Sequence, residues 1–156
     1  MTIISFIYEF GLLGLFLITM FSATIVPFPP EPAIFLSTSI YDPILVFIIA
    51  LIGGICGATI NYYIGLKGIH SFLVKRSPKK EKKAQKWFNK WGQWIIMLVP
   101  FIPFLGDPLT LVAGTLSMNL KKFYIFYLIG ISIKLTILIY SGEILFNYLA
   151  SMGIIF

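Results

Sequence analysis

The stretch VPFIPFLGDPLTLVAG, from Val99 to Gly114, decides how this chain folds. Its prolines at positions 100, 103 and 108 would break a continuous helix, because proline lacks a backbone N–H and clashes with the preceding turn. Asp107 stands inside this otherwise apolar stretch, although an aspartate at the bilayer centre costs roughly 2.5–3.5 kcal/mol. Broken backbone at membrane depth is tolerated only inside protein or beside a watery cavity. The stretch therefore predicts a re-entrant hairpin that carries a functional acid.

The composition is that of an integral membrane protein. Of the 156 residues, 58% are hydrophobic and 12% are charged, and the mean hydropathy is +0.94. A soluble domain carries about 25% charged residues. This length allows one small domain, residues 1–156. The N-terminus lacks the basic region and the cleavage site of a signal peptide, so we expect the first apolar run to stay in the membrane.

Three apolar segments are long enough to span a bilayer, which takes about 20 residues. They are Ile3–Val26, Pro43–Leu66 and Phe123–Tyr140. Asp42 and Asn119 are expected to cap the second and third segments, because their side chains can accept hydrogen bonds from the first helical turn.

Two further stretches, Pro27–Tyr41 and Trp94–Met118, are interrupted by proline and glycine. We expect each of them to enter and leave the membrane on the same side. The residues expected to shape these hairpins are Pro27, Pro29, Pro30, Pro32, Pro100, Pro103, Gly106, Pro108 and Gly114.

The two hairpins are interpreted as parts of an internal repeat. Glu31 matches Asp107 at an offset of 76 positions, and Gly54 matches Gly130 at the same offset. A chance match between short proline-rich strings is the alternative. We expect repeat one at about 3–66, a basic loop and interfacial helix at 67–93, and repeat two at about 94–142.

Eight of the twelve basic residues fall between Lys75 and Lys90. Such a run can bind nucleic acid, but a cytoplasmic loop that follows the positive-inside rule explains it better.

With this loop inside, the first apolar segment runs outward and the second inward, so the two hairpins open on opposite sides. The predicted fold is all-α and multi-pass in the cytoplasmic membrane, with about three spanning helices and two facing re-entrant hairpins. Inverted repeats with interrupted segments are typical of transporters.

Trp87, Trp91 and Trp94 recur at helical spacing among lysines, after a helix start at Ser77-Pro78. This pattern predicts an amphipathic helix that lies on the cytoplasmic leaflet. Anchoring by aromatic residues is the simpler role, and a contact with lipid headgroups is the alternative.

Glu31, Asp107 and Lys134 are candidates for a substrate or proton site, because charged groups inside a membrane are functional by default. For the two acids, the alternative is that each caps the short helix that follows it. Lys134 stands 11 residues past Phe123, about 17 Å into its helix. We expect it to pair with one of the two acids or with a phosphate.

Gly53, Gly57, Asn61 and Gly65 recur every four residues on one face of the second apolar segment. Small residues on one face let helices approach closely, and Gly130 is expected to do the same in the last segment. Asn61 is also a site candidate, since its amide can hydrogen-bond a broken backbone.

No catalytic or metal centre is predicted. His70 has no second histidine or cysteine at a ligand spacing, so neither a metal nor another cofactor is expected. Cys56 lies in an apolar run and is predicted to be a packed thiol. No serine stands near a base at a useful spacing, and we predict that the chain is not an enzyme.

Three motifs resemble those of the DedA superfamily, also called SNARE-associated or VTT-domain proteins, and particularly its short YqaA-like branch. They are VPFPPEPA at 26–33, GATINYYIG at 57–65 and FIPFLGDPLTLVAG at 101–114, and the last is the most specific. The likeness extends from about Phe16 to Gly142.

The resemblance implies two facing hairpins, a link to protons or the membrane potential, and transfer of lipids between leaflets. The implied substrates are polyprenyl phosphates or aminophospholipids. Pro100 and Gly106 stand where the family usually carries arginines, and Thr19 or Ser22 where it usually carries a glutamate. Lys134 is then the intramembrane cation that can replace those arginines.

The leading hypothesis is therefore a flippase or scramblase whose partners are membrane lipids and protons. The alternatives are a proton-coupled transporter of a small solute or ion, and a structural membrane protein that transports nothing. The sequence leaves homo-oligomerisation open.

Overall fold

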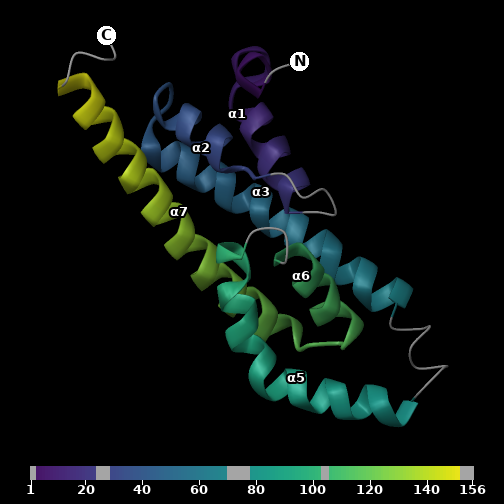
Figure 1. The fold of residues 1–156 in the computed structure, drawn as a ribbon. Helices are drawn as coiled ribbons and strands as arrows, with labels where there is room; N and C mark the ends of the chain where they lie inside the picture. Colours follow the sequence, from purple (N-terminus) through teal and green to yellow (C-terminus); the bar gives the residue numbers. More distant parts are fainter. Residues whose placement is uncertain (1–2, 24–28, 70–77, 103–105, 152–156) are drawn as a thin grey trace.

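The computed structural model describes residues 3–23, 29–69, 78–102 and 106–151, which form helices joined by short turns, with no strand among them (Figure 1). The prediction of an all-α fold is confirmed for these residues. The helices are α1 (Ile3–Ser22), α2 (Glu31–Thr38), α3 (Pro43–Ile64), α5 (Pro78–Leu98), α6 (Gly106–Thr115) and α7 (Leu120–Ser151). A π-helical turn, η1 (Gly65–Ile69), extends α3, and a 3₁₀ turn, η2 (Val99–Phe101), follows α5.

Two helices in the described part of the chain are long and apolar enough to cross a membrane, Pro43–Gly68 and Leu120–Gly142. The third expected span, Ile3–Val26, corresponds to α1, which is helical over Ile3–Ser22 but is not one of these two helices, and it stays a prediction. α1 is interrupted at Gly11, whose φ of 55° and ψ of −135° are not helical. Glycine tolerates this conformation, whereas residues with a Cβ are strained there.

α1 runs beside α3 in the same direction. Gly53 of α3 lies against Thr19 of α1, and Gly57, one turn later, lies against Met20. The expectation that these two segments run in opposite directions is therefore wrong. The physical reason is that the chain returns between them through α2, which runs parallel to α7, since Glu31 meets Lys134 and Phe35 lies beside Gly142, and therefore opposite to α3.

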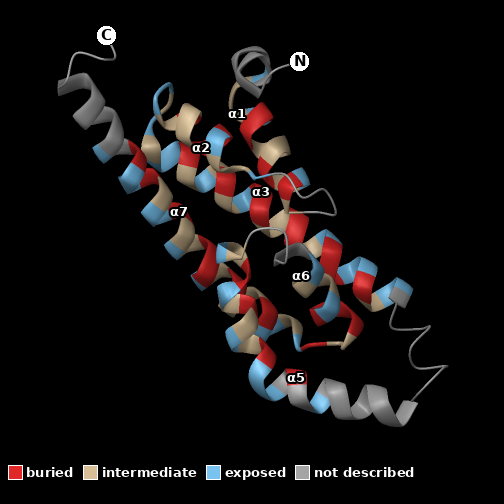
Figure 2. Ribbon diagram, in the orientation of Figure 1, coloured by how far each residue is buried: buried red, intermediate tan, exposed pale blue. Residues whose placement is uncertain are grey.

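α7 crosses α3 in the opposite direction. Tyr124 and Thr59 bring their hydroxyl oxygens within 3.1 Å, and farther along α7 the Tyr127 hydroxyl donates to the Gly54 carbonyl at 3.2 Å. The rings of Tyr127 and Phe123 stack with centroids 5.9 Å apart. Figure 2 shows buried residues along the faces where the helices meet and exposed residues on the outer faces.

The short helices α2 and α6 lie toward opposite ends of the α3–α7 pair (Figure 1). In α2, the ring of Phe35 lies beside Gly142 of α7. In α6, Gly114 lies against the backbone carbonyl of Tyr62, near the end of α3. Each short helix is followed by a turn that leads into a long helix.

Both long helices begin at the caps that the sequence predicts. The Asp42 carboxylate accepts hydrogen bonds from the N–H groups two and three residues later, at 2.8 and 3.4 Å. The Asn119 side-chain oxygen makes the same pair of bonds at 3.0 and 3.3 Å. α7 continues to Ser151, well beyond the expected end at Tyr140.

α5 begins at Pro78, as expected, but continues to Leu98 as one helix. The predicted boundary between the interfacial helix and repeat two, at about 94, therefore falls inside a helix. The end of α5 packs on α7, where the rings of Trp94 and Phe126 meet edge-on with centroids 5.6 Å apart. Gly130 of α7 lies directly against the backbone of α5 at this contact.

Replacing Gly114 by alanine should destabilise the protein, because the new Cβ would collide with the backbone carbonyl of Tyr62. Overpacking of this kind costs about 1–3 kcal/mol. We expect a lower unfolding temperature for the purified protein in detergent, measured by scanning fluorimetry. Gly68→Ala is the matched control, since a Cβ at that position meets no atom within 4 Å. Equal unfolding temperatures for the two variants would contradict the contact between α3 and α6.

Candidate functional site

An ion pair joins α2 to α7 within the second apolar span. Lys134 Nζ lies 2.6 Å from Glu31 Oε1. Lys134 stands 14 residues after Leu120 and 8 before Gly142, the two ends of the span. At 1.5 Å per residue, it is about 12 Å or more from either end. The two charges compensate each other at a depth where either one alone would be costly.

Proline places Glu31 at the start of α2. The Pro30 carbonyl accepts a hydrogen bond from the Ile34 N–H at 3.0 Å. Pro32 suits the first helical turn, where a backbone N–H has no partner within the helix. The helix dipole also stabilises a carboxylate in this turn. Glu31 therefore stands at a helix start and in an ion pair at once.

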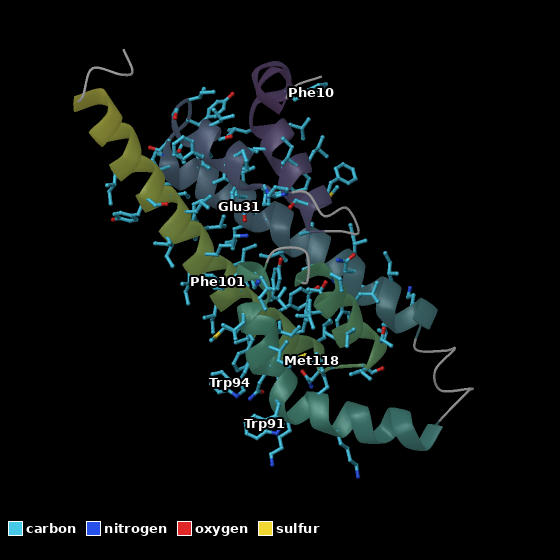
Figure 3. The ribbon with its side chains drawn as sticks, in the orientation of Figure 1. Phe10, Glu31, Trp91, Trp94, Phe101 and Met118 are labelled. Atoms are coloured by element: carbon cyan, nitrogen blue, oxygen red, sulfur yellow. The ribbon has the colours of Figure 1, made fainter. Side chains whose placement is uncertain are left out.

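The packing of α2 holds Glu31 in position. Ala33, Ile34 and Ser37 are buried on one face of the helix. The Ser37 hydroxyl donates to the Ala33 carbonyl at 2.8 Å, so this buried polar group has its partner within α2. Because these side chains are packed, the carboxylate of Glu31 extends toward α7 from a rigid support (Figure 3).

The pair is only partly covered by the protein. The side chains of Glu31 and Lys134 keep 37% and 22% of their surface exposed. Neither Phe10–Ser22 of α1 nor α3 contains a charged residue. Among the described helices that pack on α2, α7 thus supplies the counter-ion, and an anion that approaches the exposed side can compete with Glu31 for Lys134.

Asn61 is a second polar contact point, separate from the ion pair. It is 1% exposed, and its Nδ2 donates to the Ala23 carbonyl at 3.0 Å and to Thr110 Oγ1 at 3.2 Å. Its Oδ1 has no hydrogen-bond partner within the described ranges. Asn61 therefore links α3 to the end of α1 and to α6.

The structure leaves part of the expected set unplaced. Asp107 lies in the first turn of α6, but its side chain is outside the described part, as are Pro27 and Pro103. The other proline and glycine positions stand before or within helix starts, or in η2: Pro29, Pro30, Pro32, Pro100, Gly106 and Pro108.

The small residues on one face of α3 contact two different helices. Gly53 and Gly57 lie against α1, whereas Gly65 lies against the backbone of α6 near Leu111. Thr19 of α1 is buried, and its hydroxyl donates to the carbonyls of Leu15 and Phe16 at 3.0 Å. The Thr19 side chain lies against Gly53, where an added Cβ would collide with it.

Sequence reasoning missed several polar contacts and a pocket. The Tyr62 hydroxyl donates to the Met118 carbonyl at 2.5 Å, and the Thr110 hydroxyl accepts from Asn61. A pocket of about 390 Å³ lies between the start of α3 and α7, and Thr136 and Tyr140 contribute to its lining. A hydroxyl within an apolar run is the signal that could have marked these residues, but it does not identify the partner.

Comparisons with known proteins agree on one family. The VTT domain model matches residues 28–144. Undecaprenyl phosphate transporter A of Staphylococcus aureus is 31% identical over 147 residues, which cover 84% of this chain and 72% of that protein. An alkaline phosphatase-like protein of Lactococcus lactis is 29% identical over 159 residues, which cover 92% of this chain and 74% of that protein.

Inner membrane protein YqaA of Escherichia coli is 25% identical over 126 residues, which cover 80% of this chain and 85% of that protein. No solved structure matches the chain. Together with the two apolar helices, these matches identify a membrane protein. The chain belongs to the VTT-domain family, the DedA superfamily, as its proline and glycine motifs predicted.

Proposed function

We propose that the protein transports lipids by moving a phosphate-bearing headgroup between the two leaflets of the membrane. The observation that carries this proposal is the ion pair between Glu31 of α2 and Lys134 in the apolar span of α7, which is partly exposed. Two relatives are named undecaprenyl phosphate transporters, which supports a polyprenyl phosphate as the substrate class. A phospholipid headgroup offers the same phosphate chemistry.

In this mechanism Lys134 binds the headgroup phosphate, and Glu31 is the resident anion that the phosphate displaces. Charged hydrogen bonds between an ammonium and an oxyanion are strong, so the exchange replaces one favourable contact by another. Protonation of Glu31 removes the competing charge and couples transport to protons. These steps exchange ion pairs and move one proton, and they involve no hydrolysis, unlike the activity that the name of the Lactococcus lactis relative implies.

The proposed architecture is an inverted repeat with two facing re-entrant segments. Its support is that α2 and α6 each precede a capped long helix, and that α3 and α7 run in opposite directions. The caps lie 77 positions apart, at Asp42 and Asn119. The closely packed glycines Gly53 and Gly130 are also 77 positions apart. The offset between the repeats in the long helices is therefore one residue larger than the 76 positions between Glu31 and Asp107.

The proposed orientation in the cytoplasmic membrane places the lysine-rich end inside. Exposed lysines gather where α5 meets the start of α7, at Lys86, Lys90, Lys121 and Lys122. Asp42 stands at the opposite end of the α3–α7 pair. Positive charge is retained on the cytoplasmic side of membrane proteins, which supports this orientation.

The partial exposure of the ion pair also bears on the alternatives. A small-solute transporter would enclose its charged site from lipid, whereas Glu31 keeps 37% of its side-chain surface exposed. A headgroup that stays attached to its chains requires such lateral access. The partial exposure of the pair therefore favours transport of a lipid over an enclosed site for a small solute.

Lys134→Ala should abolish most of the leaflet exchange of a labelled polyprenyl phosphate in proteoliposomes. A hydrogen bond to a charged group contributes about 1.5–3 kcal/mol, so the rate should fall about tenfold or more. Lys121→Ala removes the same charge from an exposed position at the start of α7 and serves as the control. Normal transport by Lys134→Ala would rule out Lys134 as the phosphate ligand.

Glu31→Gln should keep some transport but lose its dependence on pH. In the wild type, protonation of Glu31 releases Lys134, so exchange should rise as the pH falls. Glutamine mimics the protonated carboxyl and should give a nearly flat profile over the same range. An unchanged pH profile in this variant would exclude Glu31 as the proton-linked group.

The ion pair should also contribute to the unfolding free energy of the protein, which single and double variants can measure. Lys134→Met leaves the carboxylate without its counter-ion, and Glu31→Gln leaves the ammonium without its own. The double variant carries neither charge, so its loss of unfolding free energy should be smaller than the sum of the two single losses. The difference is the coupling energy, which should be about 1 kcal/mol or more. Additive changes in unfolding stability in detergent would show that the pair contributes no coupling energy.

Single cysteines at Ser39 and Lys121, in a Cys56→Ala background, should react with an impermeant thiol reagent from opposite sides of intact cells. Ser39 lies in the turn before α3 and Lys121 at the start of α7, and both are exposed. Labelling of Ser39 from outside and of Lys121 only after permeabilisation is expected. Labelling of both from one side would eliminate the inverted-repeat proposal.

A further inference from the structure

α5 presents three different faces along its described part. Toward the rest of the protein it buries Phe88, Gly92 and Ile96. A second face carries large apolar side chains that are each 51% exposed, namely Trp91, Trp94 and Leu98. Lys86 and Lys90 are exposed on a third face of the helix. At 3.6 residues per turn, these lysines lie opposite Phe88, and the tryptophans lie between them and the buried face.

The start of α7, which packs on α5, adds positive charge. Its Lys121 and Lys122 are both exposed. The N-terminal part of α5 runs across this end of the molecule, beyond the crossing of α3 and α7 (Figure 1). Figure 3 shows the side chains of Trp91 and Trp94 extending outward from α5. This end therefore combines positive charge with exposed aromatic rings.

We propose that α5 binds the anionic phospholipids of the leaflet in which it lies, in preference to zwitterionic ones. Exposed tryptophan settles at the level of the headgroups, with its ring toward the acyl chains. Lys90 Nζ lies 5.6 Å from the centre of the Trp91 ring, so the ammonium is held at the depth of the ring. Lys86, one turn earlier on the same face, then meets the same layer of phosphates. This surface is separate from the Glu31–Lys134 pair, and the proposal does not rest on transport.

The tryptophans make this contact directly measurable. All three tryptophans of the chain, Trp87, Trp91 and Trp94, lie in α5, so intrinsic fluorescence reports on this helix alone. The protein is reconstituted into phosphatidylcholine vesicles that contain phosphatidylglycerol, with bromine on the chains of one lipid or of the other. At equal mole fractions of brominated lipid, we expect quenching by phosphatidylglycerol to be about twofold stronger, because each lysine near an anionic surface favours contact with it.

Lys86→Gln combined with Lys90→Gln should remove this preference, and the corresponding pair of arginine substitutions should keep it. If the glutamine variant does not fold, 0.5 M salt added to the wild type provides the second test, since it should weaken the preference by screening. Equal quenching by the two brominated lipids would overturn the proposal and leave a purely hydrophobic anchor. Binding of a labelled RNA oligonucleotide that abolishes the lipid preference would also overturn it, by assigning the lysines to nucleic acid.

Discussion

Backbone polar groups within a bilayer must find partners inside the protein, and Asn61 on the small-residue face of α3 supplies such a partner to the end of α1. Gly53 and Gly57 let α1 approach closely enough for the carbonyl of Ala23 to reach the Asn61 amide. The same amide bonds Thr110 of α6. One face of α3 therefore holds both the end of α1 and α6 in place.

The position of the ion pair follows from this packing. α2 is short and polar at its start, and it stays in place because its buried face packs among α1, α3 and α7. With α2 fixed, Glu31 can face Lys134 across a contact of 2.6 Å. Farther along α2, Phe35 packs beside Gly142 of α7 and so fixes the same pair of helices at a second point. A glycine on α7 thus helps to determine where a carboxylate and an ammonium meet.

The sequence was most informative where a local rule applies. Asp42 and Asn119 were predicted as caps because capping depends on the side chain and the next three residues. The helix starts near Pro32 and Pro108 and the small-residue face of α3 could be read in the same manner. A pairing of Lys134 with an acid or a phosphate was expected from charge alone. Its partner could not be chosen, because Glu31 and Asp107 have equivalent sequence contexts.

Contacts between residues far apart in the chain could not be predicted from such local rules. The direction of α1 was predicted wrongly because it depends on how the chain returns through α2, and the break at Gly11 is invisible when glycine is common in such segments. The hydrogen bonds of Tyr62 and Tyr127 depend on how α3 and α7 cross. The one-residue change in the repeat spacing arises between the short and the long helices, where sequence matching has little to align.

The proposed exchange at Lys134 also explains why a broken helix is useful there. In a continuous helix, a glutamate displaced from its lysine would face lipid with no other favourable interaction. Glu31 instead stands in the first turn of α2, where unbonded N–H groups and the helix dipole favour negative charge. A phosphate that takes Lys134 would therefore leave the carboxylate beside a second stabilising group. The proline break lowers the cost of releasing the ion pair, and the fold places that break at the depth where an anionic headgroup would pass.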